Sequence, residues 1–246
     1  MLKVYQLPRV WGIPNVSPPC MRLETWLRMA EIPHEVTVMD LVNVLPPKGK
    51  VPYVDDGGTI LGDSTFIIKH LVRTRGVDPD AELSAADRAA SWALQRMLME
   101  NTYWLVVHDR YRLEEGWQIY RRLVMEMLAP GAPEEQQALI AEEFRKGILA
   151  QYNGHGIGRH TEAEVNEIGA DDLAAISDLL GDKPFFFGEK PTTADATAYA
   201  CVTNLIEVPL DTPTSRFGRS RRNLVDFCRR MHLRFFPDIP RQDAAP

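Results

Sequence analysis

The spacing of hydrophobic and polar positions changes once along the chain, near residue 76. Before that point, short apolar runs alternate with polar residues, which is typical of strands. Val36 and Val38 fall on one face of such a run, as in a half-buried strand, and Gly57-Gly58 has the composition of a hairpin turn with positive φ. The strands predicted in this way cover residues 2–6, 34–39, 51–55 and 59–61.

Two stretches of the same region have apolar residues at helical spacing, residues 18–31 and 63–73. In the first of them, one buried stripe is predicted for Cys20, Leu23, Leu27 and Ala30. Combined with the strands, this gives the order β-α-β-β-β-α. We therefore expect residues 1–75 to form a small α/β domain.

Beyond residues 76–80, where Gly and Pro interrupt the helical pattern, strand signals disappear. Helical spacing then recurs in segments covering residues 84–111, 115–128, 133–151, 161–180, 192–206 and 220–232. The second domain, residues 83–246, is predicted to be all helical.

The composition excludes several classes of protein. A hydrophobic content of 45% and a charged content of 25% are ordinary for a soluble globular protein. The net charge of −6 argues against nucleic acid or an anionic membrane as the main partner. The first residues lack the apolar core of a signal peptide, and no run approaches the ~20 apolar residues of a membrane span.

The three cysteines, Cys20, Cys201 and Cys228, are scattered and form no Cys-x-x-Cys motif. They suggest neither a disulfide framework nor a zinc site, and we expect no metal. A reducing, cytoplasmic location is the matching expectation.

Residues 50–69 contain most of the candidate chemistry. Pro52 has no N–H to give to a ladder, so it belongs at a strand entry. A cis bond before it would leave the N–H and C=O of Val51 open to a ligand. Asp63 and Ser64 place a carboxylate, a hydroxyl and free helix N–H groups at one spot. These features describe a peptide-binding edge beside a clamp for a ligand with an ammonium and a carboxylate.

The order Val-Pro, hairpin, Asp-Ser, helix resembles the thioredoxin-like N-terminal domain of glutathione transferases. Residues 17–33, with a Ser-Pro-x-Cys start and an Ile-Pro end, are similar to the first helix of that domain in the Fax/metaxin-like branch. Residues 188–196 are similar to the C-terminal signature of the same superfamily. The resemblance spans roughly residues 2–206, and it is specific because the three motifs occur together.

The resemblance implies a thioredoxin-like domain followed by a helical domain, with a ligand cleft between them, and glutathione as co-substrate. The backbone of Val51, beside Pro52, would pair with the cysteinyl unit, Asp63 and Ser64 with the γ-glutamyl end, and Lys50 with the glycyl carboxylate. The other substrate would be a small hydrophobic electrophile. Homodimers are common in this superfamily. Metaxins carry a membrane tail, whereas residues 237–242 are polar, so we do not expect a mitochondrial surface location.

The role of Ser17 can be interpreted in two ways. Followed by Pro18, it suits a helix N-cap. By resemblance, its hydroxyl would instead donate to the glutathione sulfur and stabilise the thiolate. Lowering a thiol pKa from ~8.5 by about two units requires roughly 2.7 kcal/mol. A helix N-terminus supplies ~0.3–1 kcal/mol, and one hydrogen bond to a charged group about 1.5–3 kcal/mol, so Ser17 alone would be sufficient.

Cys20 is the competing candidate. Ser17-x-x-Cys20 has the spacing of a thioredoxin dithiol motif, but only its inner cysteine is present. That position falls on the buried stripe of the helix, which favours a core thiol over a redox nucleophile.

Two departures from the family affect the ligand site. Only eleven residues separate Met39 from Val51, which leaves little room for the helix that many relatives place there. The loop of residues 7–16 is long, and its Trp11 and Ile13 are candidates to roof a hydrophobic pocket next to the sulfur.

A second group of candidates lies on the first helix of the helical domain. Residues three and four apart share a helical face, which groups Tyr103, Trp104, His108 and Tyr111. They are candidate walls of the acceptor pocket, or simply core. Arg110 and Arg112 are expected to be solvated.

Two further motifs are interpreted as structural. Residues 192–195, Thr-Thr-Ala-Asp, form a capping box. The Gly- and His-containing residues 154–160 follow a helix and lack a P-loop Lys-Ser/Thr, so they are interpreted as a helix-terminating loop.

The leading hypothesis is a glutathione transferase whose Ser17-stabilised thiolate attacks an apolar electrophile. A non-catalytic binding or interaction protein of the same fold is the alternative, favoured by the short segment before Val51. A glutathione-dependent reductase or peroxidase using Cys20 is a third option.

Overall fold

The computed structural model of the protein describes residues 1–40 and 43–241. Its sheet has the strand order β2-β1-β3-β4. β1 (Leu2–Gln6) pairs parallel with β2 (His34–Val38) and antiparallel with β3 (Tyr53–Asp56). β3 pairs antiparallel with β4 (Thr59–Gly62) across the Gly57-Gly58 turn, where both glycines have positive φ. All four predicted strands are confirmed, with small shifts of their ends.

Helices α1 (Pro18–Met29) and α2 (Ser64–Arg75) supply the apolar side chains that cover one face of this sheet. The alternation of β1 decides which face that is, because Leu2, Val4 and Gln6 are buried while Lys3 is exposed. The core between sheet and helices includes Leu2, Val4, Leu23, Trp26, Leu27, Val54, Ile67 and Leu71. The predicted α/β domain is thus observed.

One detail of β2 differs from the expectation. Val36 is half-buried, but Val38 is 59% exposed. β2 is an edge strand of the sheet, so its end is not enclosed on both sides.

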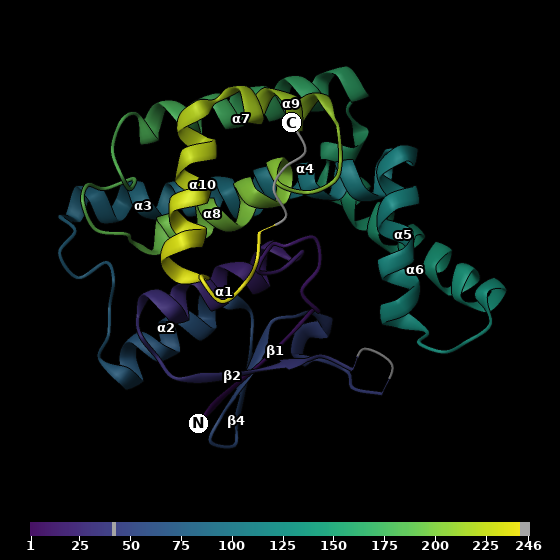
Figure 1. The fold of residues 1–246 in the computed structure, drawn as a ribbon, viewed down its shortest axis with the longest axis horizontal. Helices are drawn as coiled ribbons and strands as arrows, with labels where there is room; N and C mark the ends of the chain where they lie inside the picture. Colours follow the sequence, from purple (N-terminus) through teal and green to yellow (C-terminus); the bar gives the residue numbers. More distant parts are fainter. Residues whose placement is uncertain (41–42, 242–246) are drawn as a thin grey trace.

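The remainder of the described chain is helical, apart from an isolated bridge between Phe185 and Gly188. Its α-helices are α3 (Ala85–Met97), α4 (Tyr103–Val107), α5 (Glu114–Leu128), α6 (Glu134–His155), α7 (Glu162–Leu180), α8 (Thr193–Ile206), α9 (Pro213–Ser220) and α10 (Arg222–Phe235). Figure 1 shows these helices stacked above the sheet, with α5 and α6 projecting to one side.

The long helix predicted for residues 84–111 contains two wide, π-helical turns, η2 (Leu98–Thr102) and η3 (His108–Arg112). A π turn contains more residues than an α turn, so it shifts the phase of every side chain that follows. α5 begins directly after η3, and a Cβ on Gly116 would lie 1.7 Å from the Asp109 carbonyl oxygen. Glycine is therefore required at position 116, where α5 packs against the backbone of η3.

Two other segments differ from the sequence reading. α6 continues to His155, so Gly154 and His155 are helical and only the last part of residues 154–160, with a short 3₁₀ turn at Ile157–Arg159, forms the terminating loop. α9 was not predicted. It follows a Thr212 capping box and Pro213 at its first position, which are the helix-start signals that the sequence did carry.

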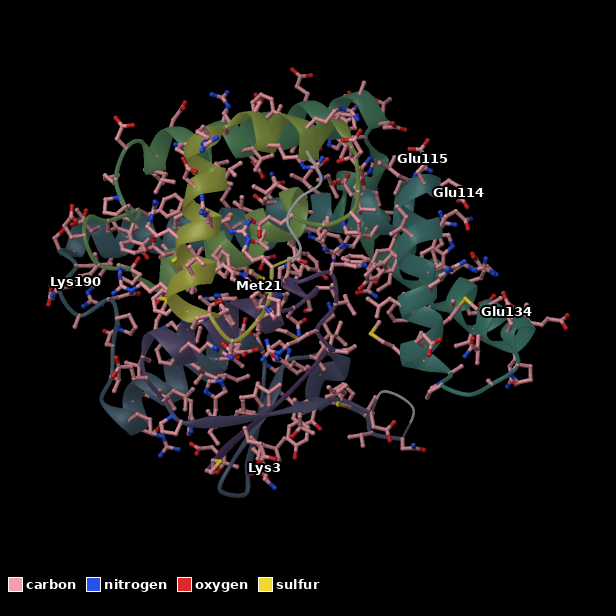
Figure 2. The ribbon with its side chains drawn as sticks, viewed as in Figure 1. Lys3, Met21, Glu114, Glu115, Glu134 and Lys190 are labelled. Carbon is pink, nitrogen blue, oxygen red and sulfur yellow. The ribbon has the colours of Figure 1, made fainter. Side chains whose placement is uncertain are left out.

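α1 and α8 lie side by side in the middle of the molecule (Figure 1). The Trp26 indole N–H donates to the Thr193 hydroxyl at 3.1 Å. Met21 of α1 is fully buried in the helical core, and Figure 2 shows it at the centre of the molecule, far from the outlying Lys3, Glu115 and Lys190. α1 therefore belongs to the cores of both the sheet and the helical bundle.

Among the described residues, no helix has both the length and the apolar composition needed to cross a membrane.

Candidate functional site

The peptide bond between Val51 and Pro52 is cis, as expected. Within the described residues, neither the N–H nor the C=O of Val51 takes part in a backbone hydrogen bond. The next residue in the chain is already committed, because the Pro52 carbonyl accepts from the Asp63 N–H at 3.3 Å. The backbone at Val51 is thus available to a ligand, and it is tied directly to the tip of α2.

The tip of α2 has the two side chains that the sequence singled out. Asp63 is the N-cap, with φ 79°, and its carboxylate accepts from the Thr65 N–H at 2.8 Å. Its side chain is exposed, whereas Ser64 is buried (3% exposed). A carboxylate facing solvent next to the positive end of a helix fits a ligand that carries both charges.

These residues line one cavity of about 150 Å³. The lining includes all five predicted glutathione-binding residues, Lys50, Val51, Pro52, Asp63 and Ser64. Pro19 of α1 also lines it, while Ser17, two residues earlier, does not. The structure therefore brings the predicted binding residues together.

The cavity also contains residues that the sequence reading missed. Arg96, Met99 and Glu100 reach it from the helical region, and Lys48 from the segment before Lys50. The spacing 96, 99, 100 places three side chains on one helical face, but nothing in a single sequence shows that this face meets α2.

The segment before Val51 is short, as the sequence indicated. Among its described residues, 40 and 43–50, the only helical element is the 3₁₀ turn η1 (Pro47–Gly49); residues 41–42 lie outside the described part. This turn packs against β4, because a Cβ on Gly62 would lie 3.0 Å from Pro47 Cβ. The Lys48 ammonium lies 4.4 Å from the Phe66 ring centre. The turn thereby places Lys48 and Lys50 at the cavity without a full helix.

Ser17 is the N-cap of α1 by position, but its side chain makes no capping hydrogen bond. Its backbone is fixed instead: the Ser17 N–H donates to Asn15 Oδ1 at 2.9 Å, and the Asn15 amide donates to the Leu7 carbonyl at 2.7 Å. Ser17 is partly exposed, and its side chain is hydrogen-bonded to the Cys20 thiol instead of capping the helix.

The backbone just before Ser17 is held from the helical region by a buried pair, Arg110 and Asn204. Arg110, expected to be solvated, is 2% exposed and donates to the Val16 carbonyl and, at 2.6 Å, to Asn204 Oδ1. The Asn204 amide donates to the Asn15 carbonyl at 3.1 Å. Arg110 lies in the wide turn η3 and ends a run of six buried residues, 105–110, that begins in α4, so its guanidinium points inward. Arg112 is exposed as predicted.

Cys20 is fully buried, and all four members of the predicted stripe are buried as well. Burial raises the pKa of the Cys20 thiol to about 12, an effect that a hydrogen bond from the Ser17 side chain partly opposes. This thiol is neutral at physiological pH and is not poised as a nucleophile.

The candidate acceptor wall divides into two groups. Trp11 and Ile13 belong to one cluster with Tyr111, in which Tyr120 packs edge-on against Tyr111 at 5.2 Å and faces Trp11 at 5.9 Å. The Arg110 guanidinium lies over the rings of Trp11 and Tyr120. Of the predicted wall residues, those in this cluster are nearest to Ser17 along the chain, because Trp11 and Ile13 belong to the loop that precedes it.

Trp104 and His108 lie in the other group, facing α6. Trp104 stacks on His155 at 4.7 Å, and His108 Nδ1 is 2.9 Å from the Tyr152 hydroxyl. Tyr103 packs edge-on against Trp104 at 5.5 Å. Tyr111, in the wide turn η3, packs against the same core cluster as Tyr103 and Trp104 and also against the cluster of Ile13. None of the acceptor candidates lines the 150 Å³ cavity.

The Thr192–Asp195 capping box is confirmed. The Thr192 N–H and hydroxyl both donate to the Asp195 carboxylate, which also accepts from the Phe186 N–H at 2.9 Å. Burial raises the pKa of Asp195 to about 6, against these hydrogen bonds. Its role is to start α8.

Comparison with known proteins agrees with this architecture. Residues 18–117 match the family model of the glutathione S-transferase N-terminal domain, and residues 169–231 that of the C-terminal domain. The isoprene-epoxide–glutathione S-transferase of Rhodococcus sp. (strain AD45) is 34% identical over 96% of this chain and 99% of its own. Failed axon connections of Drosophila melanogaster is 29% identical over 97% of this chain, which spans 59% of that protein's length. Human metaxin-2 is 23% identical over 89% of this chain and 82% of its own.

Solved structures show the same fold. The apo form of glutathione S-transferase III superposes with a TM-score of 0.61 over 100% of this chain and 99% of its own, at 18% identity. A glutathione S-transferase of Methylobacterium radiotolerans, solved with glutathione sulfonate, gives 0.59 over 100% and 97% at 16% identity. The chain belongs to the glutathione S-transferase superfamily, and its relatives include Fax- and metaxin-type proteins.

Proposed function

We propose that this protein is a glutathione transferase that joins the glutathione thiol to a small apolar electrophile. The observation that carries the proposal is the convergence of Lys50, Val51, Pro52, Asp63 and Ser64 on one cavity, with the Val51 backbone unused. The 34% identical relative, which by its name acts on an isoprene epoxide, supports the enzymatic reading and a small epoxide as the substrate class.

The charges of the cavity fit this ligand. Its lining carries three cations, Lys48, Lys50 and Arg96, and two carboxylates, Asp63 and Glu100. Glutathione carries two carboxylates and one ammonium. Asp63 would receive the ammonium, Lys50 the glycyl carboxylate, and Val51 the cysteinyl backbone. Because Arg96 and Glu100 form an ion pair with each other, Lys48 and Lys50 are the proposed cations for the glycyl carboxylate.

In the proposed mechanism, the thiol loses its proton to solvent, and the Ser17 hydroxyl donates a hydrogen bond to the thiolate. The sulfur then attacks an epoxide carbon, the carbon–oxygen bond breaks, and the resulting alkoxide takes a proton from water. Holding the thiolate and the electrophile together supplies proximity, and the hydroxyl supplies charge stabilisation. The aromatic cluster of Trp11, Tyr111 and Tyr120 is the proposed wall for the apolar part.

The test combines binding and turnover. Calorimetry is expected to show glutathione binding at millimolar concentration or below, and the bound protein to consume a small epoxide such as isoprene monoxide faster than glutathione alone. Absence of heat and of a thermal shift at millimolar glutathione would overturn the proposal.

A non-catalytic binding role is the second candidate. The observation that favours it is the replacement of a full helix before Val51 by the three-residue turn η1. Glutathione binding without turnover of any epoxide or aryl halide would support this role over the enzymatic one.

A reductase or peroxidase using Cys20 is not favoured by the structure, because that thiol is buried and its pKa is raised to about 12. A cytoplasmic location and a homodimeric state are further predictions that belong to this proposal. The three free, buried cysteines fit a reducing compartment.

A further inference from the structure

A buried arginine lies directly behind the tip of α2. Arg22, in the middle of α1, is 2% exposed. Its guanidinium donates to the Thr65 hydroxyl at 2.8 Å, to the Ser64 hydroxyl at 3.2 Å and to Gln95 Oε1 at 2.8 Å. One charged group of α1 therefore touches both α2 and α3.

All three partners of Arg22 are neutral. Within residues 1–40 and 43–241 it forms no ion pair, and its Nε is buried without a hydrogen-bond partner. Burial lowers the pKa of the guanidinium to about 10, so the group is still charged at neutral pH. The carboxylates of Asp63 and Asp80 act on this charge only through space, and its direct partners leave it without a neutralising contact.

The two hydroxyls connect this charge to the ligand cavity. Ser64 and Thr65 form the first turn of α2, and both line the cavity. Each hydroxyl oxygen accepts from Arg22, so its own O–H is free to donate toward the cavity. The positive end of α2 points to the same place. An anion bound there would receive neutral donors, the helix dipole and the field of a full charge through a buried, weakly screening environment.

We propose that Arg22 is a specificity-determining residue that acts through Ser64 and Thr65 and selects a ligand with a carboxylate at the tip of α2. The inference rests on the proposed function, in which that carboxylate is the α-carboxylate of the γ-glutamyl unit. Arg22 supplies the counter-charge, and Asp63 on the solvent side receives the neighbouring ammonium.

The test compares two ligands in matched variants. One is glutathione, and the other is γ-aminobutyryl-cysteinyl-glycine, which lacks only the α-carboxylate. The affinity of the Arg22→Met variant for glutathione is expected to fall about 10- to 100-fold, with little change for the analogue. The Arg73→Met variant, which removes an exposed charge from α2, is the control and should keep the wild-type preference.

A second variant removes the effect while keeping Arg22. Gln95→Glu would place a carboxylate against the Arg22 guanidinium and give it an internal counter-ion in nearly the same shape. Like Arg22→Met, this variant is expected to prefer glutathione over the analogue less strongly than the wild type does. This variant keeps the inference testable if Arg22→Met does not fold.

The outcomes separate the inference from the function. Equal losses for both ligands would mean that Arg22 is only structural and would overturn the inference, as would unchanged affinities. Either result, with wild-type binding of glutathione intact, leaves the proposed function standing. Failure of the wild-type protein to bind glutathione overturns both.

Discussion

Ser17 and Cys20 are one helical turn apart, yet their environments differ sharply. The Ser17 side chain is partly exposed and makes no capping bond, whereas Cys20 is fully buried with its pKa raised to about 12. At the start of α1 the hydroxyl therefore belongs to a partly exposed side chain, whereas the thiol is enclosed in the core.

Replacing Ser17 by Ala is expected to lower turnover by about 10- to 100-fold, the value of one hydrogen bond to a charged group. Glutathione affinity should change much less, because the proposed binding residues line a cavity that Ser17 does not reach. The pH at which turnover reaches half its maximum should rise, since the thiolate loses a donor. Steady-state rates between pH 6 and 9 check this. Cys20→Ala is the control with near-normal turnover, and an unchanged rate in Ser17→Ala would remove Ser17 from the mechanism.

His108 is a buried histidine held by the Tyr152 hydroxyl, and its Nε2 has no hydrogen-bond partner among the residues that the structure describes. Burial, assisted by the nearby Arg112 charge, lowers its pKa to about 4. The unfolded chain takes up this proton near pH 6.5 and the folded one only near pH 4, so stability is lost as pH falls through this range.

The wild-type free energy of unfolding should therefore fall by about 2 kcal/mol more than that of His108→Gln between pH 7 and pH 5. The other titrating groups contribute equally to both proteins, so their contribution cancels in the comparison. Urea unfolding at both pH values measures the free energy of unfolding. Equal losses in the two proteins would show that His108 is protonated in the folded state as easily as in the unfolded one.

At the scale of single elements, local rules explain which predictions succeeded. The glycine turn, the cis-proline and the Thr192–Asp195 box each depend on neighbours within a few residues, and each is observed. The shared face of Tyr103 to Tyr111 depended on an uninterrupted α-helix. The wide turn at His108–Arg112 interrupts that helix, although Tyr111 still packs against the same core cluster as Tyr103 and Trp104. The close approach of Gly116 to this turn is a contact that helical periodicity does not show.

The candidate site shows the same difference between local contacts, which the sequence indicates, and contacts between distant segments, which it does not. The predicted binding residues between 50 and 64 are close in sequence and line one cavity, whereas Arg96 and Glu100 meet them only through the docking of α3 and η2. Arg22 and Arg110 were not recognised as buried because their partners lie more than forty and ninety residues away. Long polar side chains are usually exposed, so only the folded structure reveals these exceptions.

The Arg110–Asn204 pair acts on an element rather than on a ligand, because it fixes the Asn15 and Val16 carbonyls next to Ser17. Replacing Arg110 by Met is expected to lower turnover more than 10-fold while glutathione affinity changes less than about 3-fold, since the proposed binding residues lie at Val51 and at the tip of α2. Arg112→Met, an exposed neighbour in the same turn, is the control. Stopped-flow turnover and calorimetric affinity separate the two effects, and equal changes in both would show a general loss of structure.

At the scale of the whole molecule, α1 joins the two halves. Met21 is buried in the helical core, while Ala196 of α8 is fully buried in the core of the sheet region. The Trp26–Thr193 hydrogen bond and the ion pair of Arg28 with Asp238 lie across the same boundary. Neither half would keep its apolar surface covered if the other unfolded.

This mutual burial predicts one cooperative unfolding transition. Ala196→Met adds volume to a site with no exposed area, where overpacking typically costs about 1–3 kcal/mol. Because the side chain sits between α1 and α8, the midpoint should fall while the loss of strands and of helices still coincides. Urea unfolding followed by far-ultraviolet circular dichroism and by tryptophan fluorescence checks this. Leu139→Met, an exposed position on α6, is the matched control. Two separate transitions in the Ala196 variant, with the wild type still showing one, would mean that each half holds together alone and that α1 merely connects them.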